Sequence, residues 1–427
     1  MKHAFLFQAI FRKYCALLLL CAVLITLALH TNMACASVTQ FTYSLDNSMS
    51  TLADSSTPSC SALQPSESLV ERKVFSTDLP TQINSIAAAC ILDDGTVAFS
   101  TQNSVFFYHF ASGVTTHVDL HHPRLTSKSD LRVLTILKMG QNAAVIPIYD
   151  YQADQSYCVL IEDESIAAYS APFKAIFECA TIAAGQIFLG GNYMYGSSDQ
   201  RKMASWYCVM NQELEIVCQN TLTATMKTDR SSLADISVAF TFHDTPVMVE
   251  YIRQNEIISV QLNQLDVDGE VTVQKVLDIT NHISAKEFHA LHLYEALQLS
   301  PDTCCLAGVL QYDDDRSFIC MLDEHLQIKD VILLDQTLID IEKSGSGFYA
   351  ITVADDHTFY EISHSKDLYD AVQIKQFLSE DESRRDPRFM LRLNRSTFIT
   401  LGVCYPPLHG KNEAYIGILQ QECQYRQ

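Results

Sequence analysis

Residues 181–217 read TIAAGQIFLGGNYMYGSSDQRKMASWYCVMNQELEIV and contain two short apolar segments, GQIFLGG and ASWYCVMN, separated by a polar loop. Short runs rich in Ile, Phe, Tyr and Val that are bounded by Gly, Asn or Asp predict β-strands joined by turns. Another apolar run precedes Gly185, and ELEIV follows the polar turn after Asn211. This stretch therefore predicts four consecutive antiparallel strands.

The same order of segments recurs along the chain. The second strand of each repeat aligns most clearly, as GTVAFST (95–101), AAVIPIYD (143–150), GQIFLGG (185–191), TPVMVEY (245–251), TCCLAGVL (303–310), SGFYAITV (346–353) and STFITLGV (396–403). Four short strands repeated at intervals of roughly 40 to 50 residues are typical of a β-propeller blade. The sequence predicts an all-β fold, a single seven-bladed β-propeller of four-stranded antiparallel blades.

The ends of the repeats predict how the ring closes. The last repeat reaches EAYIGILQ (413–420), and only QECQYRQ follows it. Upstream of the first repeat, LVERKVFS (69–76) alternates in polarity but has no blade of its own. An unpaired edge strand invites aggregation, so we expect this N-terminal strand to complete the last blade.

The repeat at residues 185–217 contains Gly190-Gly191 and Trp206, which are features of a propeller blade. It resembles blades of the seven-bladed propellers in the kelch-like and quinoprotein-like superfamilies, and the resemblance covers the architecture of nearly all of residues 69–427. It implies a propeller. It carries over no particular activity, because propellers host catalysis, ligand capture and scaffolding alike.

Residues 1–36 predict a secretory signal peptide. Basic residues at positions 2, 12 and 13 precede an apolar run at 16–29, and Ala34-Cys35-Ala36 matches a small-residue processing site. The run is shorter than the roughly 20 residues of a membrane span, which favours cleavage after Ala36 over an uncleaved anchor. Lipidation of Cys35 is a further alternative. Only an uncleaved or lipidated N-terminus would attach the chain to a membrane.

The sequence also predicts the domain boundaries, and its charge excludes one class of partner. Residues 37–68 are rich in Ser and Thr and predict a flexible tether, and residues 69–427 form the propeller domain. The formal net charge is −21, which excludes a nucleic-acid partner because phosphate binding depends on Lys and Arg. We expect an exported protein that is periplasmic, on the cell surface or secreted.

The cysteines do not form a recognisable redox or zinc motif. Of 14 cysteines, three lie within residues 1–36, and the remaining 11 cannot all pair within one chain. Cys158, Cys208 and Cys320 occupy the same place in three third strands, where we expect a buried slot for a small side chain. Cys304 and Cys305 are adjacent in a strand and should point to opposite faces of the sheet.

Other polar clusters favour ordinary loops over metal sites. His121 and His122 form a pair without the three or four convergent ligands of a metal site, which favours solvated loop histidines. Asp268-Gly269 between two strands predicts a hairpin turn. No catalytic motif is present, and we expect no metal and no cofactor.

The longest loops predict the binding face, because binding residues concentrate on loops held by a rigid scaffold. Loops between second and third strands, and between blades, share one face of a propeller around the mouth of the central channel. The candidates for contact on this face are Tyr193, Tyr195, Arg201, Trp206, Asp313, Asp315, His357 and His409.

The sequence favours an exported, non-enzymatic binding or scaffold protein that presents this face to a protein or glycan partner. The alternative is a carbohydrate-active or quinoprotein-type enzyme acting at the channel mouth. A pocket with converging carboxylates or a cofactor would favour the enzyme, and a broad surface of mixed polarity would favour the binding protein.

Overall fold

The computed structural model describes residues 66–75 and 85–424, except for residues 125–129, 141, 196–201, 225–232, 255–256, 283–289, 312–315, 335, 345–346, 354–359, 366–371, 378–383, 395 and 406–410. The chain divides into two compact units, Met1–Gln64 and Pro65–Gln427, and all described residues belong to the second. The predicted signal peptide and nearly all of the predicted tether therefore lie outside the described residues.

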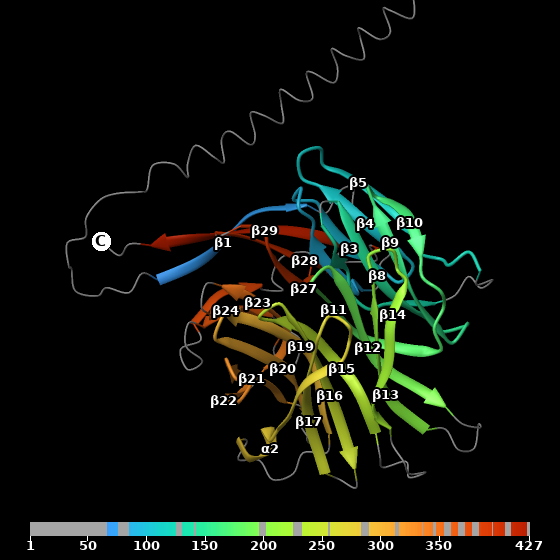
Figure 1. The fold of residues 1–427 in the computed structure, drawn as a ribbon. Coiled ribbons are helices and arrows are strands. Elements are labelled where there is room, and N and C mark those ends of the chain that lie inside the picture. The colour runs from blue at the N-terminus through green and yellow to red at the C-terminus, as the bar shows by residue number, and fades with distance from the viewer. Residues whose placement is uncertain are drawn as a thin grey trace, which may run out of the picture. The chain divides into compact units, whose positions relative to one another are not determined.

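The described strands belong to seven sheets in which neighbouring strands are antiparallel (Figure 1). The first three sheets in chain order contain β2 (Ala88–Ile91), β3 (Val97–Ser100), β4 (Ser104–His109) and β5 (Val114–Asp119); β6 (Leu131–Val133), β7 (Leu137–Lys138), β8 (Ala143–Asp150), β9 (Gln155–Glu162) and β10 (Ser165–Tyr169); and β11 (Ala175–Ala183), β12 (Gln186–Tyr195), β13 (Lys202–Met210) and β14 (Ile216–Ala224).

The remaining four sheets follow the same order. They contain β15 (Leu233–Phe242), β16 (Thr245–Gln254), β17 (Ile257–Leu265) and β18 (Val271–Leu277); β19 (Ala290–Ser300), β20 (Thr303–Gln311), β21 (Arg316–Asp323) and β22 (Ile328–Leu334); β23 (Thr337–Ser344), β24 (Gly347–Val353), β25 (Tyr360–Ser365) and β26 (Val372–Phe377); and β27 (Arg384–Arg392), β28 (Thr397–Tyr405) and β29 (Glu413–Gln424) with β1 (Ser66–Phe75). A short helix, α2 (Ile279–His282), follows β18. This arrangement confirms an all-β propeller of four-stranded antiparallel blades.

The hydrophobic core lies between the sheets. Among the described residues, six of the seven clusters of buried side chains join two sheets that follow one another in the chain, and the seventh joins Phe99 of β3 to Leu401 of β28 and Ile416 of β29. The second strands are covered on both sides, so β3 is buried along its whole length, whereas the outer strand β18 is mostly exposed. This burial explains why the second strands are apolar runs and do not alternate in polarity.

The N-terminal strand β1 pairs with the C-terminal strand β29. The antiparallel register runs from Ser66 opposite Gln424 to Phe75 opposite Ile416. The strand begins three residues before the predicted boundary at 69. It contributes the outer strand of the sheet β1-β29-β28-β27, so residues from both ends of the domain share one sheet.

Candidate functional site

A cavity of about 590 Å³ lies where the first strands of the seven sheets meet. Its lining comes from β2, the connection between β6 and β7, β11, β15, β19, β23 and β27. Several of these strands are labelled near the middle of the domain in Figure 1. A volume of this size falls within the roughly 300 to 1,000 Å³ of small-molecule sites.

Bulges in the first strands supply part of this lining. Five first strands skip one residue in their register with the second strand, and the skipped residues are Glu178, Ser237, Tyr294, Ile339 and Arg388. All five line the cavity. A β-bulge inserts an extra residue and re-aims side chains, a device found next to functional sites. The repeated bulge therefore places one additional side chain per blade at the cavity wall.

Glycines opposite three of the bulges allow the close approach of the two strands. A Cβ atom on Gly191 would lie 2.0 Å from the carbonyl oxygen of Ile176, and one on Gly402 would lie 2.1 Å from that of Asp386. A Cβ atom on Gly308 would lie 2.3 Å from the carbonyl oxygen of His292. Any larger residue at these positions would push the bulged strand away and alter the cavity wall.

Glu295 on β19 and Asp340 on β23 face each other in the cavity wall. Their carboxyl groups share a hydrogen bond, and Asp340 Oδ2 accepts a second one from the backbone nitrogen of Met390 at 2.6 Å. Burial raises the pKa of both groups, and the neighbouring Asp340 raises that of Glu295 further. A hydrogen bond between two carboxyl groups requires a proton on one of them.

Two more carboxyl groups line the cavity. Burial raises the pKa of Glu342 to about 7, although its Oε1 accepts a hydrogen bond from the backbone nitrogen of Lys343 at 3.0 Å. Glu178, on β11, forms an ion pair of 2.8 Å with Arg132. Among the described residues of the lining, Arg388 is the only cation, and it lies 2.7 Å from Asp386. The lining therefore carries four acids against one cation that is already paired.

Asp235, on β15 beside this lining, extends the acidic character of the region. Its Oδ1 accepts a hydrogen bond from Asn192 Nδ2 at 3.2 Å. Burial and the charge of Glu178 raise its pKa to about 6.

The predicted loop-face residues can be placed only in part. Tyr193 lies on β12 and is 36% exposed, whereas Trp206 lies on β13, is 7% exposed and stacks on Phe177 with ring centroids 5.9 Å apart. Trp206 therefore belongs to a core cluster in this structure, and the structure brings neither residue to the cavity lining. The side chain of Tyr195 and all of Cys35, Arg201, Asp313, Asp315, His357 and His409 lie outside the described residues.

The prediction of solvated loop histidines was wrong for His122. This side chain is 4% exposed, contacts the rings of Tyr157 and Tyr169, and accepts a hydrogen bond from the backbone nitrogen of Arg124 at its Nδ1. Burial lowers its pKa, so the imidazole is kept neutral. It is a packed core residue, although the sequence around it is typical of a loop.

The predictions for the cysteines are confirmed. Cys158, Cys208 and Cys320 are fully buried and free. Cys304 packs in the cluster shared with the preceding sheet, and Cys305 in the cluster shared with the following one. Burial raises the pKa of Cys158, Cys208 and Cys320, so these thiols are poor nucleophiles.

The cavity carboxyl groups were not predicted from the sequence. A signal for them exists, since Glu178, Glu295 and Asp340 each place an acidic residue between apolar residues of a first strand, in IFECATIA, LYEALQL and LIDIEKS. Charged residues are almost never buried in such a strand without a specific role or partner. This interruption repeats in several blades, which distinguishes it from a single misplaced charge.

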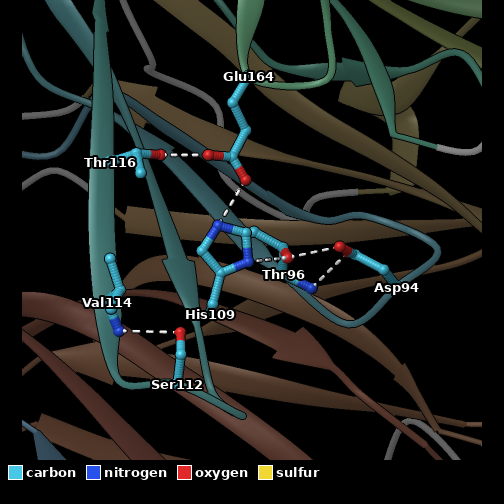
Figure 2. A network of polar contacts seen from close by, with 7 residues as sticks. All are labelled: Asp94, Thr96, His109, Ser112, Val114, Thr116 and Glu164. Atoms are coloured by element: carbon cyan, nitrogen blue, oxygen red, sulfur yellow. Dashed lines mark hydrogen bonds and ion pairs between the residues drawn. The ribbon is translucent and has the colours of Figure 1, made fainter. Parts of the chain in front are cut away.

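A second polar network ties the first sheet to the turn between β9 and β10, as Figure 2 shows. His109 Nε2 lies 2.5 Å from Glu164 Oε1, and His109 Nδ1 lies 3.0 Å from Thr96 Oγ1. Thr116 donates to the other oxygen of Glu164. The order hydroxyl, histidine, carboxylate is that of a hydrolytic triad. However, Thr96 is buried and donates its proton to Asp94 Oδ2 at 2.8 Å, so the network is structural.

Two further kinds of feature are absent from the part of the chain that the structure describes. No group of three or more His, Cys, Asp or Glu side chains there is arranged to hold a metal ion. No helix in the same residues has the length and apolarity required to cross a membrane.

Comparisons with known proteins identify similar folds only. No protein-family model matches the chain, and no curated protein matches it in sequence. Solved structures that resemble it include a chain of the mitotic checkpoint complex (8% identity, TM-score 0.49, covering 86% of this chain and 96% of that one). Another is the β-propeller domain of the Trilobed protease from Pyrococcus furiosus (10% identity, TM-score 0.48, covering 80% of this chain and 98% of that one). A third is the Cps50 (Swd1) β-propeller domain from Myceliophteria thermophila (10% identity, TM-score 0.46, covering 83% of this chain and 100% of that one).

Proposed function

We propose that this chain is a non-enzymatic binding or scaffold propeller whose binding site includes the central cavity. The observation that carries the proposal is a cavity of about 590 Å³ whose wall receives one bulged residue from each of five blades. A rigid ring of strands that presents polar groups to a central space is suited to holding a ligand in one orientation.

The cellular location and the partner extend the proposal. The sequence of residues 1–36 supports export to the periplasm, the cell surface or the medium, with cleavage after Ala36 or lipidation at Cys35. A protein or glycan partner would contact the long-loop face, with Tyr193 at its described edge. In this proposal the cavity holds a small part of that partner and the surrounding loops hold the rest.

The finer architecture belongs to the same proposal. We propose that the seven sheets are the seven blades of one ring, closed by β1. This arrangement is supported by contacts between successive first strands, in the order β2, β7, β11, β15, β19, β23 and β27, and by contacts of β27 with β2. Deleting residues 66–75 should then lower the melting temperature of the whole domain. An unchanged melting transition would exclude a closing role for β1.

One observation favours a second candidate, a carbohydrate-active enzyme. Glycoside hydrolases use two carboxyl groups, one of which is kept protonated at neutral pH by its surroundings. Glu295 and Asp340 converge in the cavity, and burial raises the pKa of both. Their direct hydrogen bond argues against this role, because a sugar needs about 5 Å or more between the two groups.

A panel assay separates the two candidates. The purified protein would be mixed with oligosaccharides and with basic and acidic peptides, and its melting temperature and the integrity of each sugar would be measured. The binding role predicts that at least one class raises the melting temperature and that no sugar is cleaved. Cleavage that disappears in Glu295→Gln would establish the enzyme, and the absence of any shift would refute the binding role.

A further inference from the structure

The carboxyl groups on the β19 and β23 side of the cavity have no permanent cation beside them. Among the described residues, neither Glu295 nor Asp340 has an ion-pair partner, and Arg388 is engaged by Asp386. The two acids line the same cavity from adjacent first strands, and their carboxyl groups lie close enough to share a hydrogen bond and its proton. A positive charge close to such carboxyl groups favours their ionised form, so a cation that enters the cavity can take the place of the shared proton.

The same cavity holds a second unused polar group. Ser237, the bulged residue of β15, lines the cavity, and its Oγ is buried without a hydrogen-bond partner among the described residues. Buried hydroxyl groups nearly always have a partner, so this hydroxyl retains hydrogen-bonding capacity that a group bound beside it can use. Tyr294, 40% exposed beside Glu295, adds an aromatic surface that attracts organic cations.

The type of cation follows from the geometry. No described group of three or more acidic, His or Cys side chains is arranged for a metal ion, whereas an ammonium group needs only two or three acceptors around its N–H bonds. The net charge of −21 draws cations toward the domain and repels anions, and a cleft lined by acids focuses this field. These features favour an organic ammonium group over a metal or an anion.

We propose that the cavity binds an organic ammonium group between the carboxyl groups of Glu295 and Asp340. The group would belong either to a free diamine or polyamine, or to a lysine side chain of a protein partner that enters the cavity from its mouth. This inference rests on the proposed binding function and adds the chemistry of the ligand to it.

Binding is linked to proton release. The ammonium ion enters with its own proton, so the carboxyl pair must lose at least part of one proton to solvent when the complex forms. The titratable and charged groups around the pair are Tyr294 on β19, Cys305 on β20, Glu342 and Lys343 on β23, Arg388 and Arg392 on β27, and Glu178 on β11. Because the acids are protonated at low pH, affinity should rise with pH.

Isothermal titration calorimetry of the purified protein tests the proposal. The probes are 1,5-diaminopentane and the blocked peptide acetyl-Gly-Lys-Gly-amide, each titrated in two buffers of different ionisation enthalpy. We expect saturable binding of at least one probe, release of protons, and an affinity about tenfold higher at pH 8 than at pH 5.5. Binding of the diamine alone identifies a free amine as the ligand, and tighter binding of the peptide identifies a lysine side chain.

Matched variants locate the site. Glu295→Gln and Asp340→Asn should each weaken binding about tenfold or more, because each replaces an acid with a neutral group of the same shape. Glu213→Gln, at an exposed turn, should leave it unchanged. Circular dichroism verifies that the variants fold, and the pH dependence of the wild-type protein tests the proposal without any variant.

Three results would overturn the inference: no heat of binding for either probe, equal affinity of the wild-type protein and both variants, or full competition by Ca²⁺ at equal concentration. If neither amine probe binds while an oligosaccharide or acidic peptide still raises the melting temperature, the proposed ammonium ligand is wrong and the proposed binding function stands. If nothing in either panel binds, the proposed binding function fails with it.

Discussion

Replacing Glu342 with glutamine should change how the stability of the domain depends on pH. Burial raises the pKa of Glu342 in the folded protein from its ordinary value of 4.5 to about 7. Between these two values the folded state keeps a proton that the unfolded chain has lost. The free energy of unfolding therefore falls as pH rises through this window, and above pH 7 the full penalty of the buried charge is present.

The size of the penalty follows from the two pKa values. Because each pKa unit corresponds to roughly 1.4 kcal/mol, the difference amounts to about 3 kcal/mol of destabilisation at pH 8. Glutamine cannot ionise, and its oxygen can still accept the hydrogen bond from the backbone nitrogen of Lys343. We expect Glu342→Gln to match the wild-type protein at pH 4.5 and to exceed its stability by about 2 to 3 kcal/mol at pH 8.

Urea unfolding at both pH values provides the assay. Trp206 is the only tryptophan of the chain and is buried, so its fluorescence reports unfolding. Glu213→Gln serves as the control at an exposed turn, and its effect should be the same at both pH values. Parallel pH profiles for the wild-type protein and Glu342→Gln would contradict this expectation, because they would show that Glu342 ionises as readily in the folded protein as in the unfolded chain.

Three further changes test the packing. Gly191→Ala should destabilise the domain by roughly 3 kcal/mol, since the new Cβ would lie 2.0 Å from a carbonyl oxygen, whereas Gly113→Asn in open space should be nearly neutral in the same urea titration. Cys208→Ala should cost about 1 to 2 kcal/mol in thermal unfolding, and loss of ligand binding by a folded variant would contradict its packing role. Glu164→Gln should cost about 1 kcal/mol, and a cost no larger than that of the exposed control Glu162→Gln would show that the His109 contact contributes nothing.

The sequence predicted the blade pattern because the fold rests on features that repeat. The second strands are buried on both faces, so each reads as an unbroken apolar run that can be aligned across repeats. The hairpin turn at Asp268-Gly269 was also predicted from the sequence. Gly269 has a φ of +85° in the hairpin between β17 and β18, where Asp266 accepts hydrogen bonds from two backbone nitrogens. The small buried position shared by Cys158, Cys208 and Cys320 was recognised by comparing repeats.

The central cavity was harder to predict because a bulge changes the register by one residue and leaves no periodic signal. Glu178 belongs to a strand that the sequence predicted, but only the register shift shows that its side chain lines the cavity. The sequence placed binding in the long loops, and most of those candidates lie outside the described residues. His122 was misjudged for a related reason, since its burial depends on Tyr157 and Tyr169, both distant in sequence.

The most direct test of a binding site in the central cavity is a crystal structure of the protein grown with 1,5-diaminopentane. We expect electron density for the diamine inside the cavity, with one nitrogen within hydrogen-bond distance of both Glu295 and Asp340. Diamine density found only on the outer surface, with Glu295 still hydrogen-bonded to Asp340 in an otherwise water-filled cavity, would contradict this expectation.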